Sequence, residues 1–204
     1  MIEHSKNEDQ QIKKLNALLK ISNIINEKEP PSVLIKKISE VVAGFLDADR
    51  VSFFFHDERT DELYTHFAWG LTKGEISVPK DLGIVGMVFS SNSIVRTNAP
   101  YDHPHFYFHS DLETGYKTEN LIALPVVHKN KTIGAFQALN KKTSNEFTEE
   151  DEAFLTELLE QISALLNVLK RRDVDEYQTH MLRDAVSGII KWADEFRRSH
   201  KIGT

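Results

Sequence analysis

ENLIALPVVH (residues 119–128) and TIGAFQAL (132–139) are two strand-forming stretches, separated by a short polar turn. Both are rich in β-branched and other apolar residues, so they predict an antiparallel hairpin. A second hairpin is predicted upstream, where RVSFFFH (50–56) and ELYTHFAW (62–69) flank the polar sequence DERTD. Consecutive hairpins favour an antiparallel sheet over the parallel sheet of dinucleotide-binding folds.

Helical patterns surround these hairpins. Apolar residues recur at steps of three and four along residues 12–25, 33–46 and 155–169. Shorter elements are predicted between the hairpins: a strand at 75–78, a helix after Gly83 and a strand at 93–97. Thr148 followed by Asp151 resembles a capping box and predicts the start of the last of these three helices. The order of these helices and strands along the chain predicts an α+β fold whose antiparallel sheet is covered by helices on both faces.

The two ends of the chain carry apolar helical stripes of their own. A stripe from Val174 to Phe196 follows the charge-rich residues 170–176 in a shifted register, so either a stutter or a break is expected there. Residues 1–30 are interpreted as a dimerisation and signalling helix, 31–169 as the domain, and 170–204 as a C-terminal helical extension. The long N- and C-terminal helices are predicted to form a dimer spine, which makes the protein a homodimer.

Composition excludes several classes of function. The 204 residues carry 25 Lys and Arg against 31 Asp and Glu, a net charge of −6 without the basic face that nucleic acids require. Cysteine is absent, which removes disulfides, thiolate nucleophiles and iron–sulfur ligation. The start of the chain is polar and no apolar run approaches the roughly 20 residues of a membrane span. We therefore expect a cytoplasmic protein that binds neither nucleic acid nor membrane.

Two longer motifs carry a family resemblance. The first is TGYKTENLIALP, within the aromatic-rich stretch 98–127, and the second is a dispersed Asn-Lys, Phe, Asp-Glu signature within 134–152. The region 31–169 resembles a GAF domain. Within that family it is similar to the members found in cyclic-nucleotide phosphodiesterases and bacterial adenylyl cyclases. The signature residues are Asn140, Lys141, Phe147, Asp151 and Glu152.

The resemblance implies a six-stranded antiparallel sheet that holds a cyclic nucleotide beneath the long loop at 98–118. The cyclic phosphate would meet the backbone N–H groups at the start of the helix after Gly83, where the helix dipole favours an anion. The implied ligand-binding residues are Ser52, Phe67, Ile84, Val85, Gly86, Tyr107, Asp111, Thr114, Thr118 and Gln137. The signature residues would act mainly as an internal lock in which Lys141 pairs with Asp151.

The identity of the base rests on two departures from cyclic-GMP-binding members. Ala68 stands where an acidic residue often follows the stacking aromatic residue Phe67, and Gln137 stands where a glutamate is often found. Guanine favours a carboxylate acceptor, whereas an amide can match the donor and acceptor of adenine. Cyclic AMP is therefore slightly favoured as the ligand, and no other cofactor is required.

The resulting hypothesis is a non-enzymatic sensor whose ligand shifts the flanking helices and acts on an effector domain or partner protein outside this chain. Asp111 and Glu113 alone do not make a hydrolytic site, because no nucleophile or electrophilic stabiliser accompanies them. Two alternatives stay open: a dimerisation scaffold with no nucleotide, and a sensor of haem or another small molecule, suggested by His103, His105 and His109. Ser52 and Thr118 can also be ordinary strand hydroxyls bonded to backbone, and Phe67 can be core.

Overall fold

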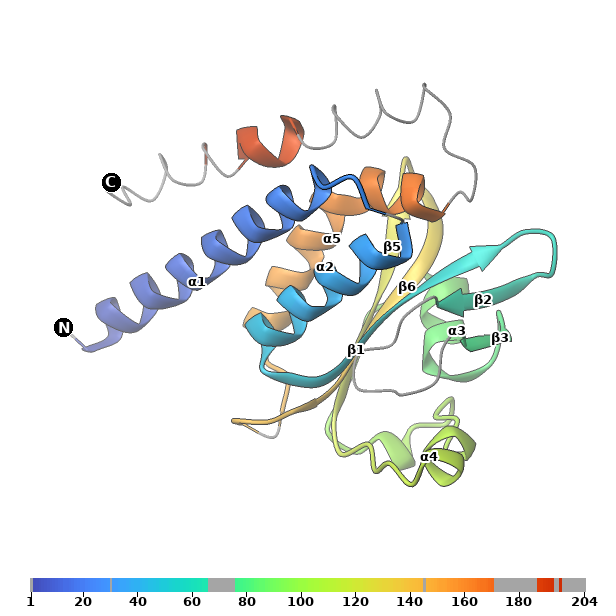
Figure 1. Cartoon of the computed structure of the whole chain (residues 1–204). Helices are drawn as coiled ribbons and strands as arrows, with labels where there is room; N and C mark the ends of the chain where they lie inside the picture. Colours follow the sequence, from blue (N-terminus) through green and yellow to red (C-terminus); the bar gives the residue numbers. More distant parts are fainter. Residues whose placement is uncertain are drawn as a thin grey trace.

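The computed structural model describes residues 2–29, 31–65, 76–144, 146–170, 187–192 and 195. Two helices precede three strands, and the remaining helices and strands follow in the arrangement that Figure 1 shows. The elements are α1 (Ile2–Ile25), α2 (Pro31–Leu46), β1 (Ala48–Asp57), β2 (Glu62–Thr65), β3 (Ile76–Pro79), α3 (Gly83–Ser91), β4 (Val95–Thr97), a 3-10 turn (Pro100–Asp102), α4 (His109–Thr114), β5 (Leu121–His128), β6 (Lys131–Lys141) and α5 (Glu149–Lys170).

The six strands form one antiparallel sheet in the order β3-β2-β1-β6-β5-β4. Both predicted hairpins are present, as β1 with β2 and β5 with β6. The second is closed by two residues, Lys129 and Asn130, whose φ angles of 48° and 62° are typical of the tight turn that suits the twist of a hairpin. The predicted α+β class and antiparallel sheet are therefore confirmed.

A helical layer of α1, α2 and α5 covers one face of the sheet (Figure 1). Because side chains alternate along a strand, Val51, Phe53 and Phe55 of β1 all point into this layer. Phe53 meets Phe136 of β6 edge to face, with ring centres 5.1 Å apart. This larger core anchors the sheet and leaves the intervening residues of each strand on the opposite face.

The opposite face is covered by α3 and a smaller core. Phe54, Ala135 and Ala123 pack there against Ile84 and Val88. Helices therefore lie on both faces of the sheet, as predicted. The remaining positions on this face, which include Arg50, Ser52 and Gln137, lie beyond the small core. We call this part of the sheet face, around Arg50, Ser52 and Gln137, the lid-facing side, because residues 98–118, the lid, lie at this end of the domain.

The predicted capping box at the start of α5 is confirmed. The Asp151 N–H donates to Thr148 Oγ1 at 3.3 Å, and the Thr148 N–H donates to Asp151 Oδ2 at 2.8 Å. Asp151 takes the place of the longer glutamate that is usual in this motif. Together, Thr148 and Asp151 accept from two backbone N–H groups that have no acceptor within the helix. The cap fixes where α5 begins, directly beneath the end of β6.

The terminal helices are described in part. Residues 187–192 are helical, and Ile189 and Trp192 join the larger core against the helical layer. The rest of the stripe at 174–196 lies outside the described residues, as does the predicted continuation of β2 through 66–69 with Phe67. Among the helices that are described, none is long and apolar enough to cross a membrane.

Candidate functional site

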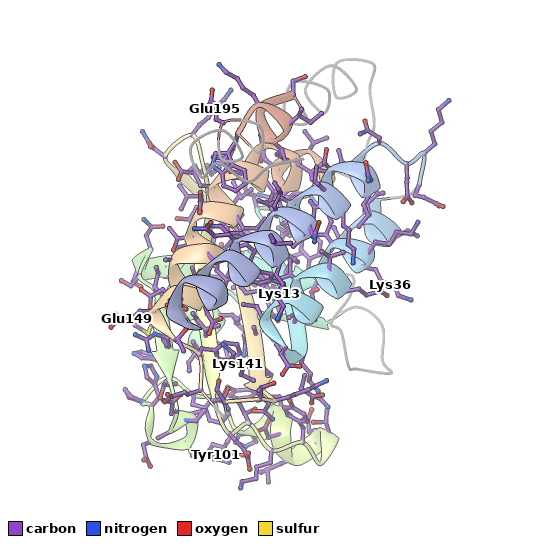
Figure 2. All side chains as sticks on the ribbon, turned by 90° about the vertical axis from the view of Figure 1, so that its left-hand side faces the viewer. Lys13, Lys36, Tyr101, Lys141, Glu149 and Glu195 are labelled. Atoms are coloured by element: carbon purple, nitrogen blue, oxygen red, sulfur yellow. The ribbon has the colours of Figure 1, made fainter. Side chains whose placement is uncertain are left out.

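Residues 98–118, here called the lid, form an ordered segment between β4 and β5. A loop was predicted, and the structure adds a 3-10 turn at Pro100–Asp102 and the helix α4. α4 ends at Gly115, whose φ of 66° lies in the left-handed region that favours glycine. Figure 2 shows Tyr101 of the lid at the end of the molecule opposite Glu195, with Lys141 between them.

Asp111 and Thr118, both predicted ligand contacts, bind each other inside the lid. The Asp111 carboxylate accepts from the Thr118 N–H at 2.8 Å, the Thr118 hydroxyl at 3.0 Å and the Tyr101 hydroxyl at 2.8 Å. Asp111 is 7% exposed and Thr118 is 1% exposed. The hydrogen bond to Asp111 raises the pKa of Tyr101, so the phenol stays a donor. These bonds satisfy a buried carboxylate and fold the lid on itself.

Tyr116 attaches the end of the lid to β1. Its hydroxyl donates to Asp49 Oδ2 at 2.9 Å, and its ring lies 3.4 Å from the guanidinium carbon of Arg50. Burial raises the pKa of Tyr116, and the bond to Asp49 acts in the same direction. The sequence interpretation missed this contact. The available signal was the strand alternation, which places Arg50 two residues before Ser52 on the same face.

Ser52 and Gln137 are directly opposite each other on β1 and β6. Both are half-buried and lie on the lid-facing side of the sheet. Neither side chain makes a hydrogen bond within the part of the chain that the structure describes. The alternative of a strand hydroxyl bonded to backbone is therefore not seen for Ser52, while the Thr118 hydroxyl bonds a carboxylate instead.

The start of α3 brings Ile84, Val85 and Gly86 next to the lid. A Cβ on Gly83 would lie 3.4 Å from Cβ of Tyr107, so the lid touches this helix end. No side chain caps α3, so the N–H groups of Ile84 and Val85 have neither a cap nor a helical partner. The Gly86 N–H, predicted as a third donor to the ligand, instead donates to the Leu82 carbonyl at 3.2 Å. The side chains of Ile84 and Val85 are buried in the smaller core, so only their backbone can meet a ligand.

Gly86 has a packing reason to be glycine. A Cβ at this position would lie 2.6 Å from the carbonyl oxygen of Lys80 and 2.7 Å from the carbonyl carbon of Asp81. The residue is buried, and the first turn of α3 therefore rests directly on the preceding backbone.

The other predicted lid contacts lie at the surface. Tyr107 is 41% exposed, and the Thr114 hydroxyl donates to the Ser110 carbonyl at 2.7 Å within α4. The His109 ring stacks on Tyr107 with centres 5.1 Å apart, and the His103 ring centre lies 6.0 Å from that of His105. Within the described residues, no three histidines and carboxylates are arranged to hold a metal ion.

Asn140 of the signature pins the end of the lid to β6. Its φ of 52° turns the strand, and its side-chain oxygen accepts from the Glu119 N–H at 2.7 Å. Its side-chain nitrogen donates to the Lys117 carbonyl at 2.8 Å. An asparagine tolerates this backbone conformation and supplies both a donor and an acceptor.

The remaining signature residues join β6 and β4 to the start of α5. The Lys141 ammonium pairs with Asp151, as the resemblance implied, and their side chains are 15% and 9% exposed. Phe147 is fully buried in the larger core. Glu152 accepts from Arg96 of β4 at 3.0 Å. The signature therefore supports the sheet beneath the lid.

A hollow of about 290 Å³ opens to solvent at the base of the lid. It is lined by residues 98–102 and 117–119, and it shares only Thr118 with the predicted ligand contacts. This hollow is distinct from the lid-facing side of the sheet, where Ser52 and Gln137 lie.

Comparisons with known proteins agree with this architecture. The GAF domain model matches residues 30–166. The GAF domain of an Acinetobacter phosphoenolpyruvate-protein phosphotransferase is 25% identical, with a TM-score of 0.62 over 74% of this chain and 90% of that one. The corresponding domain from Coxiella burnetii is 20% identical, with a TM-score of 0.66 over 76% and 92% of the two chains.

A third solved structure is the free methionine-R-sulfoxide reductase from Neisseria meningitidis in complex with its substrate. It is 20% identical, with a TM-score of 0.59 over 83% of this chain and 89% of that one, a likeness of fold. The narrower resemblance to cyclic-nucleotide-binding members stays a prediction. The family model, which spans most of the chain, shows that the protein belongs to the GAF domain family.

Proposed function

We propose that this GAF domain, a regulatory small-molecule sensor, binds a cyclic nucleotide between the lid, the start of α3 and the lid-facing side of the sheet. The observation that carries the proposal is the opposed pair Ser52 and Gln137. Both are polar, half-buried and without a side-chain partner among the described residues. Polar groups removed from water need hydrogen bonds, and a ligand under the lid would supply them.

The chemistry of the surrounding groups suits a nucleotide with one negative charge. The uncapped N–H groups of Ile84 and Val85 at the start of α3 would meet the cyclic phosphate, helped by the helix dipole. Tyr107 lies beside this helix end and would border the phosphate and ribose. The amide of Gln137 matches the donor and acceptor edge of adenine, so cyclic AMP is the first ligand to test and cyclic GMP the second.

Binding would be transmitted through the sheet to the helical layer. β1 follows α2 directly, and α2 packs against α1 and α5 in the larger core. A ligand that binds one arrangement of these helices more tightly shifts the population toward that arrangement. The proposed output is a change in a homodimer formed through the terminal helices, read by an effector domain or a partner protein.

A second candidate is a dimerisation scaffold that takes no nucleotide. It is favoured by Asp111 and Thr118, whose polar groups are occupied by each other and by Tyr101. In the scaffold the lid is a structural cover and the Ser52 and Gln137 side chains contact water. The two candidates differ in whether a nucleotide binds at all.

Isothermal titration of the full chain with cyclic AMP and with cyclic GMP separates them. The sensor predicts saturable binding, weakened about tenfold in Ser52→Ala and in Gln137→Leu through one lost hydrogen bond each. Matched controls are Ser90→Ala in α3 and Gln161→Leu in α5, which lie away from the pair and should bind like the wild type. Absence of heat for both nucleotides at high micromolar concentration supports the scaffold, and a Soret absorbance band would indicate haem.

A further inference from the structure

α4 is held on the domain by polar contacts. Its only buried residue is Asp111, while Leu112 is 71% exposed and the preceding Phe108 is 45% exposed. The helix therefore contributes no apolar side chain to either core. Segments with little apolar burial belong to the part of a protein that opens at low free energy. Phe106, three residues before α4, packs against the smaller core, so it is α4 and the residues after it that depend on specific polar contacts.

Tyr116 provides such a contact between α4 and the sheet. Its backbone N–H donates to the Asp111 carbonyl at 3.1 Å, so the residue is attached to the first turn of α4. Its side chain lies on β1, where the hydroxyl binds Asp49 and the ring lies over Arg50. We call these three side chains, Tyr116, Asp49 and Arg50, the Tyr116 clamp.

The clamp combines a cation–π contact at Arg50 with a hydrogen bond at Asp49 that water can reach. Arg50 has no carboxylate partner in the described part of the chain, so the face of its guanidinium is available to the Tyr116 ring. The Asp49 side chain is 45% exposed and has Lys142 at 3.8 Å as a second cation. Water can replace the phenol at Asp49 when the lid moves away. Asp111 is occupied within the lid, so it does not compete for Arg50.

The position of the clamp relates it to the proposed ligand site. Arg50 lies two residues before Ser52 on the same face of β1, about 7 Å along the strand. Opening the lid at Tyr116 would uncover the side of the sheet that carries Ser52 and Gln137. Asn140 holds Lys117 after α4, and before α4 the lid is held by Phe106, which packs against the smaller core, and by Asn98, which donates to Glu146 at 3.1 Å. Tyr116 is thus the contact that attaches the end of α4 itself to the sheet.

We propose that the Tyr116 clamp keeps the lid closed in the absence of ligand and that a ligand enters only when Tyr116 leaves Arg50 and Asp49. Tyr116 is then a positioning residue that controls the rates of ligand entry and exit. The part of this inference that concerns a ligand rests on the proposed function, whereas the closed lid can be tested on the free protein.

Chymotrypsin cleavage of the ligand-free full chain after Phe106 tests the clamp, because this lid residue packs against the smaller core while the lid is closed. When reclosing is faster than cleavage, the cleavage rate follows the population of open lid. Tyr116→Phe and Asp49→Asn each weaken the same hydrogen bond and should raise lid cleavage about tenfold. Tyr116→Ala also removes the ring from Arg50 and should raise it about a hundredfold.

The matched control is Tyr64→Phe, which removes a hydroxyl bonded to the Lys170 carbonyl far from the lid. It should leave lid cleavage unchanged. If Tyr116→Ala fails to fold, as judged by circular dichroism, Tyr116→Phe and Asp49→Asn decide the question. Wild-type cleavage rates in both of these folded variants would overturn the clamp.

Stopped-flow binding of cyclic AMP and cyclic GMP provides a second readout. The clamp predicts that Tyr116→Phe raises the association rate and the dissociation rate together, with a smaller change in Kd. A structural role alone would lower the affinity through the dissociation rate only, and that result would overturn the gating role. Absence of nucleotide binding in the wild type, combined with faster lid cleavage in Tyr116→Phe, would refute the proposed function and support the closed lid.

Discussion

Replacing Asp151 with alanine should cost this domain a large part of its stability. The carboxylate accepts from the Lys141 ammonium, from the Thr148 N–H at 2.8 Å and from the Thr148 hydroxyl at 3.1 Å. Removing it leaves the Lys141 side chain, 15% exposed, without its partner. Breaking a buried pair in this way costs about 3–5 kcal/mol, and losing a helix cap costs about 1 kcal/mol.

These contributions overlap, because Lys141 can partly relax toward solvent. We therefore expect Asp151→Ala to lower the free energy of unfolding by about 3–4 kcal/mol in total. Asp151→Asn keeps an acceptor for Thr148 and loses the charge, so about 2 kcal/mol is expected. A domain of this size typically shifts its Tm by about 2–4 °C per kcal/mol, which gives roughly 6–16 °C for the alanine variant.

Urea denaturation followed by circular dichroism measures the effect. A double-mutant cycle of Lys141→Met and Asp151→Asn should show a coupling free energy of about 1.5 kcal/mol or more. Glu150→Ala, at the exposed position next to Asp151, serves as the control and should change stability by less than about 0.5 kcal/mol. An unfolding free energy of Asp151→Ala within about 1 kcal/mol of the wild type, or an additive cycle, would refute the role of Lys141 and Asp151 as a lock.

Two further predictions concern packing and assembly. Gly86→Ala should lower the unfolding free energy by about 1–3 kcal/mol, since its Cβ would lie 2.6 Å from a backbone oxygen. The control is Gly44→Ala in α2, whose Cβ meets no atom within 4 Å and which should be neutral or stabilising. Equal melting temperatures of the two variants would contradict this. Ile12 and Leu19 are 44% and 38% exposed, seven residues apart on α1. The full chain should therefore have the mass of a dimer by light scattering, and Ile12→Asp with Leu19→Asp that of a monomer; a monomeric wild type would refute the dimer.

The fold could be predicted because its signals are local. Alternating residues such as Val51, Phe53 and Phe55 define a strand and its buried face, and the pattern of Thr148 and Asp151 marks the start of α5. α4 has no such signal, since its six residues include no apolar periodicity. It forms because Gly115 ends the helix with its N–H on the Asp111 carbonyl, and because the Asp111 carboxylate ties the helix to Thr118 and Tyr101 of the lid.

The site could be predicted only in part, because its contacts join distant residues. The alternation of β1 places Ser52 on one face, but its partner Gln137 follows only from the register of β1 with β6. Hydroxyls and carboxylates such as those of Thr118 and Asp111 have the same chemistry whether they bind a ligand or each other. The contact of Tyr116 with Asp49 spans 67 positions and leaves no trace in a local pattern.

A crystal structure of the full chain grown with cyclic AMP would show directly whether a nucleotide lies under the lid. We expect a nucleotide enclosed by the lid, with its base within hydrogen-bond distance of Ser52 and Gln137 and its phosphate on the N–H groups that begin α3. A structure in which the protein's own side chains fill that space, with no nucleotide bound, would contradict it.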